Sequence, residues 1–357
     1  MGAGAGAFST SVANSKFAGW ASGRDWHNRE KNQPQNIGYR TSNYEVFRTK
    51  QFKRDMVTKR CLTALLLVCF LFCNPVSSLA SEVVDQAGRT VMLPDDPQRI
   101  VSLAPSITEI VFQLGEEKRL VGVTQYSTYP EAARLLPRVG SYVRLDVEKI
   151  ISLKPDLCLA IKDGNPEHAV NRIVSLGIPV YVIDPRNIGD IIDVVARFGE
   201  LLHAAEASSQ LIENMRARLN RVKDLVAKTA ARPGVFFQID ATPIITVGDN
   251  TFINELISLA GGRNLAAGEI AYPRYNWEEI LKMAPEVAIV ASMAGGHTPD
   301  ELMAGWRKWP QIPAVSNNRI HVVDANLIDR PTPRLVDGLE LFVRIIHPEL
   351  FTETSVE

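Results

Sequence analysis

The sequence predicts an α/β protein with two lobes of similar build joined by one long helix. Short apolar runs of strand length alternate with segments of helical period on both sides of the midpoint, which is typical of parallel sheets covered by helices. Residues 147–156 also return as residues 277–286, with a glutamate, an isoleucine and a proline at the same places. One helix, one proline break and one buried strand are therefore used twice. A cleft between two similar lobes is a natural place to hold a ligand.

The first 80 residues are not expected to be part of this fold. Residues 1–55 are polar, begin with a Gly/Ala alternation, and are expected to be a non-native or disordered extension. Residues 56–80 follow the pattern of a secretory signal peptide, with a basic start, about twelve apolar residues from Cys61 and small residues before a cut near Ala80. The apolar run is too short to span a bilayer comfortably. We therefore expect an exported protein.

The near-neutral charge of the whole chain hides an acidic mature protein. Positions 1–80 hold 11 of the 39 basic and 4 of the 40 acidic residues, which leaves 28 basic and 36 acidic residues, a net charge of −8. This balance argues against a nucleic-acid partner and against an anionic membrane surface. Cys158 is the one cysteine beyond the leader, so a disulfide framework is excluded there and a buried structural thiol is expected.

Residues 81–98 are expected to form an extended lead, and residues 99–203 the first lobe. The strands of the first lobe are expected at 100–103, 120–123, 157–161 and 179–183.

Helix boundaries in the first lobe follow from caps and glycines. Ser106 and Glu109 are predicted to form a capping box at the start of a helix that ends at Gly115. Asn165 is predicted to cap a second helix, with a proline in its first turn and Gly177 after its end.

Residues 204–228 are predicted to be the helix that joins the lobes. They lack proline, carry apolar residues at helical spacing, and lie near the midpoint of the mature chain. Residues 229–350 are expected to form the second lobe and residues 351–357 a tail. A second capping box is predicted at Asn276 and Glu279, and the strands of this lobe are expected at 235–239, 244–247, 287–291 and 319–323.

Enzyme signatures are absent from the sequence. It contains no Gly-x-Ser-x-Gly elbow, no P-loop, no Gly-x-Gly-x-x-Gly after a strand and no His-Glu-x-x-His. The histidines of the mature part are isolated, and His297 is the best single metal candidate, although a surface-loop histidine is the interpretation we favour. No catalytic residue and no metal site are predicted.

Aromatic residues follow predicted strands in both lobes. Tyr126, Tyr129 and Tyr142 lie in loops of the first lobe, and Tyr272 precedes the second copy of the repeat. Open α/β sheets bind ligands at the carboxyl ends of their strands, and rings with a polar tip suit a large, flat, partly polar ligand. Arg330, with Arg334 close by, is placed to meet a ligand carboxylate or phosphate. Ordinary half-buried tyrosines and solvated arginines are the alternative interpretation.

The chain resembles the periplasmic substrate-binding proteins of iron-siderophore, haem and cobalamin ABC importers. The resemblance covers about residues 99–348, and its motifs are Arg99–Glu109, Val121–Val123, Glu148–Asp156, Ser175–Val180 and Ala260–Gly262. It is most similar to the cobalamin (vitamin B12) binders of that superfamily, through Tyr126–Pro130, Gly164–Glu167 and Asp329–Arg334.

The resemblance implies the helical-backbone periplasmic binding fold, with two Rossmann-like lobes joined by a single rigid helix. It implies a transported ligand, cobalamin or a related corrinoid, and no cofactor. Tyr126, Tyr129, Tyr142 and Tyr272 are then ligand contacts, and Arg330 is placed with them at the cleft.

The same resemblance implies partners and a compartment. Glu148 and Glu278 match the exposed glutamates that family members present to the permease, although the dipole at a helix start also favours a carboxylate there. The expected protein is a periplasmic monomer that delivers its ligand to an ABC permease and ATPase complex at the inner membrane.

Other interpretations stay open at this point. A haem or ferric-siderophore binder of the same superfamily differs only in its ligand. A tetrapyrrole chelatase-like enzyme would need a convergent His/Glu pair in the cleft. An anchored sensor domain would need residues 61–72 to be retained.

Overall fold

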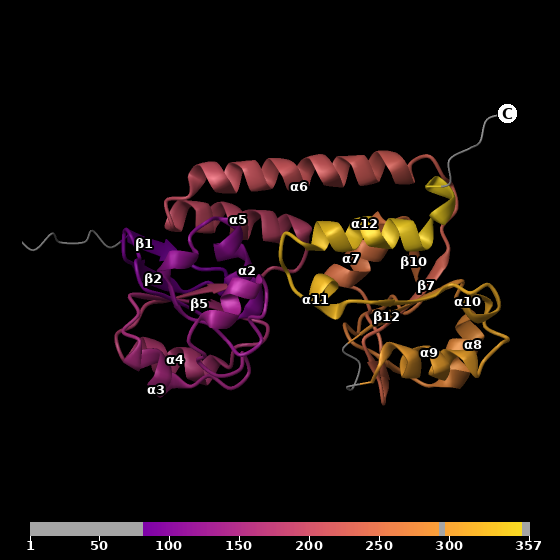
Figure 1. The fold of residues 1–357 in the computed structure, drawn as a ribbon, viewed down its shortest axis with the longest axis horizontal. Helices are drawn as coiled ribbons and strands as arrows, with labels where there is room; N and C mark the ends of the chain where they lie inside the picture. The colour runs from indigo at the N-terminus through magenta and orange to yellow at the C-terminus, as the bar shows by residue number, and fades with distance from the viewer. Residues whose placement is uncertain (1–80, 293–296, 352–357) are drawn as a thin grey trace, which may run out of the picture. The chain divides into compact units, whose positions relative to one another are not determined.

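The structure, a computed structural model, describes residues 81–292 and 297–351. The predicted extension and signal peptide (1–80) and the tail beyond residue 351 lie outside the described residues. Within the two described ranges, no helix has both the length and the apolar character needed to cross a bilayer. The predicted α/β class is confirmed, with parallel sheets covered by helices (Figure 1).

The first lobe is built on a four-stranded parallel sheet of order β4-β3-β5-β6. A short antiparallel hairpin of β1 and β2 precedes it, and Asp85 in the turn accepts a hydrogen bond from Val182 N of β6 at 3.3 Å. The strands are β1 (Ser81–Val84), β2 (Thr90–Leu93), β3 (Ile100–Ser102), β4 (Leu120–Gly122), β5 (Leu157–Ile161) and β6 (Val180–Ile183). The helices are α2 (Pro105–Gln113), α3 (Val147–Ser152) and α4 (Glu167–Ser175), with 3-10 turns η1 (Glu117–Arg119) and η2 (Glu131–Leu135).

The second lobe repeats this plan with the parallel order β10-β7-β12-β13 and adds a small antiparallel sheet of order β11-β9-β8. Its strands are β7 (Gly234–Gln238), β8 (Asp240–Ala241), β9 (Ile244–Ile245), β10 (Arg263–Asn264), β11 (Arg274–Tyr275), β12 (Val287–Ala291) and β13 (Ile320–Val323). Its helices are α7 (Phe252–Leu259), α8 (Trp277–Met283), α9 (Pro299–Arg307), α10 (Pro313–Ser316), α11 (Ala325–Ile328) and α12 (Leu335–Ile346), followed by the 3-10 turn η4 (Pro348–Leu350).

The central strands β5 and β12 are buried on both faces, as parallel strands covered by helices must be. Alternate residues of β5 enter different cores: Leu157 and Leu159 pack with α2 and α5, whereas Cys158 and Ala160 pack with α3 and α4. Cys158 is a free, fully buried thiol, as predicted. Burial raises its pKa to about 12, so the thiol is protonated at neutral pH.

The sequence repeat is a structural repeat. In each copy a short helix ends in a left-handed residue, Lys154 (φ 48°) or Ala284 (φ 47°), before the proline and the buried strand. The acidic residue after the proline then accepts hydrogen bonds at the start of the neighbouring strand. Asp156 accepts from Gln98 N and Arg99 N, and Glu286 accepts from Gly234 N.

The helices α5 (Ile188–Leu201) and α6 (Ala205–Val226) pack against each other, and α6 runs along both lobes (Figure 1). α6 has 22 residues, about 33 Å at 1.5 Å per residue. Leu211 and Ile212 of α6 contact the cores of both lobes. Arg218 then fastens α6 to the second lobe through Glu340 of α12, at 2.9 and 2.7 Å.

Two predicted caps in the first lobe are wrong. α2 starts at Pro105, which needs no hydrogen-bond partner for its nitrogen, so Ser106 and Glu109 lie inside the helix and make no cap. α4 starts at Glu167, also without a side-chain cap, and Asn165 bonds elsewhere. The capping box of Asn276 and Glu279 at α8 is confirmed.

Candidate functional site

Three tyrosines of the first lobe gather beyond the carboxyl ends of its strands. Tyr126 and Tyr129 follow β4, and Tyr142 lies in the loop before α3. Their exposed fractions of 47%, 43% and 37% leave the rings open to a ligand. The rings of Tyr126 and Tyr142 meet edge to face with centroids 5.9 Å apart. The structure therefore brings together two of the predicted ligand residues from separate loops.

A buried chain of hydroxyl groups holds the loop that carries Tyr126 and Tyr129. Ser127, between them, contacts Thr108 of α2 at 2.9 Å and Thr124 at 3.0 Å. Thr108 continues the chain to Ser102 at the end of β3, at 2.8 Å. Because these polar groups are all buried and satisfied, the loop has a defined backbone position.

Tyr142 sits at the tip of a tight turn. Ser141 accepts a hydrogen bond from Arg144 N at 2.9 Å, which closes the turn. Asn165, predicted to be a helix cap, instead donates to Tyr142 O and to Leu103 O, both at 2.8 Å. Gly164 has φ +134°, and a Cβ there would lie 3.0 Å from the Tyr142 ring. The motif Gly164–Asn165 therefore positions Tyr142.

Arg330, predicted to face a ligand, connects the two lobes. It lies in the segment between α11 and α12, and its guanidinium donates to Glu109 of α2 at 2.7 Å. It also donates to Tyr126 O at 3.1 Å and to Asn326 Oδ1 at 2.7 Å. Its side chain is 14% exposed. Much of its hydrogen-bonding capacity is thus used within the protein.

Arg334 completes this contact. Its guanidinium lies 3.8 Å from the centroid of the Tyr129 ring, a cation–π arrangement. It also donates to the second carboxylate oxygen of Glu109 at 3.3 Å.

Tyr272 stands apart from the other three tyrosines. It lies in the loop before β11 and is 49% exposed. Burial raises the pKa of its phenol, and the charge of Asp163 adds to that shift while Arg186 opposes it. Asp163 and Arg186 belong to the first lobe, so Tyr272 faces that lobe across the site. No contact joins the Tyr272 ring to another aromatic ring among the described residues.

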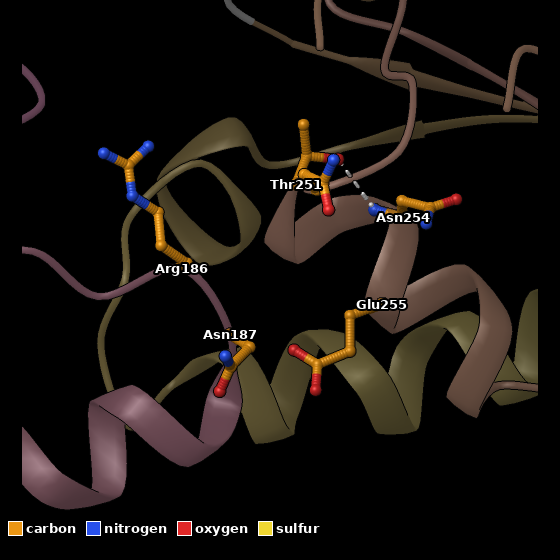
Figure 2. Close-up of a pocket in the computed structure, with 6 residues that line it drawn as sticks. Arg186, Asn187, Thr251, Asn254 and Glu255 are labelled. Carbon is orange, nitrogen blue, oxygen red and sulfur yellow. Dashed lines mark hydrogen bonds between the residues drawn. The ribbon is translucent and has the colours of Figure 1, made fainter. Parts of the chain in front are cut away.

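A cavity of about 570 Å³ lies between the segment that follows β6 and the start of α7. Figure 2 shows its polar lining, with Arg186 and Asn187 on one side and Thr251, Asn254 and Glu255 on the other. Glu255 accepts a hydrogen bond from Ile188 N at 2.8 Å, which ties α7 to the first turn of α5. Burial raises the pKa of Glu255. The cavity cannot be predicted from the sequence, because its lining comes from the start of α5 and the start of α7, which are more than 60 positions apart.

Asp329 lies in an environment that disfavours its charged form. It precedes Arg330, and burial raises its pKa from an ordinary value of 3.8 to about 7. Among the described residues, its Oδ1 atom is buried without a hydrogen-bond partner. The sequence shows it only as one more charge in a polar run.

Glu148 and Glu278, the predicted docking residues, are not part of this cluster. Each is the second residue of its helix, α3 or α8, and each is exposed. Neither side chain has a hydrogen bond or ion pair within the described ranges. They occupy equivalent places in the structural repeat.

Metal-binding geometry is also not found in the described part of the chain, where no three His, Cys, Asp or Glu side chains converge. His297 is exposed and lies 3.7 Å from Glu301, at a helix start.

Comparisons of the sequence with known proteins identify relatives. A family model described as periplasmic binding protein matches residues 100–327. The vitamin B12-binding protein of Vibrio cholerae serotype O1 is 32% identical over 286 residues, which cover 78% of this chain and 95% of that protein. An uncharacterized ABC transporter substrate-binding lipoprotein of Bacillus subtilis, YvrC, is 33% identical over 276 residues, covering 75% and 86%.

Solved structures show the same relationship. The periplasmic vitamin B12 binding protein BtuF of Vibrio cholerae superposes with a TM-score of 0.63 at 30% identity, covering 73% of this chain and all of that one. The periplasmic heme-binding protein RhuT from Roseiflexus sp. RS-1 superposes with a TM-score of 0.65 at 26% identity, covering 71% and 99%.

Proposed function

The chain belongs to the periplasmic binding protein family, and on that premise we propose that it is the substrate-binding subunit of an ABC importer for cobalamin or a related corrinoid. The observation that supports this class of ligand is the group of exposed tyrosine rings beyond the strands of the first lobe: Tyr126, Tyr129 and Tyr142. Tyr272 from the second lobe would close over the opposite side of the ligand. Aromatic faces with polar edges suit a large, flat ligand that carries polar side chains.

The role is transport and not catalysis. What supports this role is that the matching family is described as periplasmic binding protein and that one relative is named an ABC transporter substrate-binding lipoprotein. Cobalamin is then cargo and not a resident cofactor. The partners are a permease and its ATPase, and the place of action is the periplasm or, more broadly, the outer side of the inner membrane.

Glu148 and Glu278 are proposed as the contacts to the permease. Their support is geometric: both are exposed, both are the second residue of a helix, and the two helices are equivalent in the two lobes. A pair of equivalent carboxylates suits a partner with two equivalent basic sites.

Release would follow from the joining helices. Leu211 and Ile212 of α6 pack against both cores, so large closure motions would disrupt buried contacts. A preformed cleft keeps the ordering cost of binding low. The permease would then release the ligand by moving the two lobes apart through Glu148 and Glu278.

The alternative ligand within this family is haem, because a structural relative is named a heme-binding protein. Exposed tyrosines are also possible axial ligands to haem iron. A visible absorption spectrum of the purified protein distinguishes the two ligands.

The test is a calorimetric titration of the Ser81–Glu357 protein with cyanocobalamin, with haemin as competitor. One-to-one binding that weakens in Tyr142→Ala and in Tyr272→Ala is the expected result. Val174→Ala on α4, an exposed apolar residue outside the tyrosine loops, is the matched control and should bind normally. Binding of haemin alone would overturn the corrinoid proposal and keep the transport role.

A further inference from the structure

Glu109 is a charged residue in the interior of the first lobe. Its carboxylate is fully buried, on a helix where the sequence suggested only a cap. Each of its two oxygens contacts a different arginine of the second lobe, Arg330 at 2.7 Å and Arg334 at 3.3 Å. Burial raises its pKa, and the two arginines oppose this shift.

The same two arginines hold the loop of predicted ligand tyrosines. Arg330 donates to the backbone oxygen of Tyr126, and Arg334 covers the ring of Tyr129. One buried carboxylate thus orients two guanidinium groups, and each of these contacts one tyrosine of the neighbouring lobe. The carboxylate bridges the two guanidinium groups, one oxygen to each, and these charge-assisted hydrogen bonds fix direction as well as distance.

The free-energy cost of breaking these ion pairs depends on whether the lobes separate or one partner is removed. If the lobes separate, Glu109 and both arginines regain water. If one partner is removed while the lobes stay together, a buried charge remains without its partner, and this is strongly unfavourable. While the lobes stay in contact, the two ion pairs therefore favour one relative placement of α2 and the α11–α12 segment.

We infer that Glu109 is a positioning residue for ligand capture: through Arg330 and Arg334 it sets the opening between the lobes and holds Tyr126 and Tyr129 in their binding positions. The role in ligand capture rests on the proposed function. The role of Glu109 in holding the loop of Tyr126 and Tyr129 does not. It assigns Arg330 chiefly to positioning, where the sequence suggested direct contact with the ligand. It also assigns the exposed face of Tyr129, opposite Arg334, to the ligand.

Glu255 offers an internal comparison. It also joins the lobes, with a partly buried carboxylate that accepts a hydrogen bond from Ile188 N, and it has no hydrogen bond to a tyrosine among the described residues. Loss of Glu255 should therefore affect the joint at α5 without moving residues 124–130. Loss of Glu109 should move that loop.

The experiment measures two quantities on the purified full chain: hydrogen exchange of residues 124–130, and the affinity and dissociation rate for cyanocobalamin. Glu109→Gln keeps the size of the side chain and removes its charge. We expect faster exchange in 124–130 and about tenfold or greater weakening of binding, mainly through faster dissociation. Asp337→Asn, which alters an ion pair of Arg218 away from the site, controls for general loss of an ion pair and should change neither quantity.

Further variants separate positioning from folding. Glu109→Asp keeps the charge on a shorter side chain and should give a smaller effect than Glu109→Gln. Arg334→Gln should increase hydrogen exchange near Tyr129, while the hydrogen bond from Arg330 to Tyr126 O remains. In the double variant Glu109→Gln with Arg330→Gln, binding should be no weaker than in the worse single variant, because both changes break the same contact. If Glu109→Gln does not fold, Glu109→Asp and Arg334→Gln carry the test.

The outcomes separate the two proposals. Unchanged exchange in 124–130 in Glu109→Gln would refute the positioning role, whatever the ligand. Faster exchange with unchanged affinity would show that the loop position does not matter for capture, and would also refute it. If the unaltered protein binds neither cyanocobalamin nor haemin, the proposed function fails, while the exchange data still decide whether Glu109 holds the loop.

Discussion

The two lobes use the same backbone unit with different side chains at its ends. In the first lobe the break between α3 and β5 is held by Asp156 and also by Arg99, whose guanidinium donates to Leu153 O and Lys154 O at 2.6 and 3.0 Å. In the second lobe the position of Arg99 is Gly234, so Glu286 holds the break without a neighbouring arginine side chain. The strand order and the left-handed residue are the same in both. The unit is thus a scaffold that tolerates substitution at its edge.

The loops differ more than the scaffold. The first lobe supplies three exposed tyrosines, whereas the second supplies Tyr272, two arginines and the titrating Asp329. One side of the site is therefore aromatic and the other is charged. Similar lobes with unlike loops give a cleft that can orient an asymmetric ligand, which is how function is usually placed on a shared fold.

The largest expected effect concerns an exposed feature that the lobes share, the glutamate at the second position of α3 and of α8. Reversing both Glu148 and Glu278 to Arg should reduce cobalamin uptake by intact cells at least about tenfold, because like charges would oppose a basic partner at both lobes. Binding of cyanocobalamin to the purified variant should be unchanged.

If the two lobes dock equivalently, Glu148→Arg alone and Glu278→Arg alone should reduce uptake by factors similar to each other. Glu167→Arg and Asp300→Arg, exposed acids at the starts of α4 and α9, are matched controls. Normal uptake in the double variant would remove both glutamates from the docking proposal.

The second prediction concerns the charged side of the site. Asp329 has its pKa raised from 3.8 to about 7, so the folded protein keeps a proton that the unfolded chain has released between these values. Its contribution to stability is therefore complete below about pH 4 and is lost as pH rises toward 7. Asp329→Asn should abolish this pH-dependent loss of stability. Relative to the parent, the unfolding free energy of the variant should therefore rise by up to about 1.4 kcal/mol per pH unit across that window.

Urea unfolding at pH 4, 6 and 8 checks this dependence. The difference between variant and parent should grow with pH and level off above about pH 7. A difference that stays constant with pH would mean that Asp329 is ionised in the folded protein.

The third prediction compares the two strand clamps. Asp156→Ala removes acceptors for two backbone amides, whereas Glu286→Ala removes the acceptor for one. We expect losses of about 2–3 kcal/mol and about 1 kcal/mol respectively in unfolding free energy, because hydrogen bonds to a charged group exceed ordinary ones. Chemical denaturation of the two variants side by side is the measurement, and equal losses would show that Arg99 compensates in the first lobe.

The smallest effect tests the equivalence of the lobes directly. Lys154→Gly and Ala284→Gly each replace a left-handed residue with the residue that adopts this conformation without strain. Both variants should be more stable than the parent by about 0.5–1 kcal/mol. Opposite signs in thermal or urea unfolding would mean that the two breaks are not equivalent.

Much of the fold could be predicted because it depends on local patterns. The apolar runs at 157–161 and 287–291 are buried strands, and Gly115 and Gly177 follow helix ends with positive φ. The predicted capping box at Asn276 also forms. These features require only residues within a few positions of one another.

The wrong caps show where local reasoning fails. Glu109 and Asn165 each have a local pattern that suggests a cap, and each is used instead by residues distant in the sequence. Leaving a buried carboxylate without a cation costs more free energy than leaving a helix start without a side-chain cap. The arginines of the second lobe therefore determine the role of Glu109. Nothing near Glu109 in the sequence identifies Arg330 as its partner.

The sequence by itself determined the α/β class, the internal repeat, the places of the strands and helices, and the loops that carry tyrosines, because periodicity, glycine, proline and strand composition act over short distances. The tertiary structure alone decided which groups meet: Tyr126 with Tyr142, Arg334 with Tyr129, and Glu109 with both arginines. The contacts of the two arginines form because the lobes bring segments more than 200 positions apart in the sequence into one low-dielectric region, where a charge is stable only beside its partner.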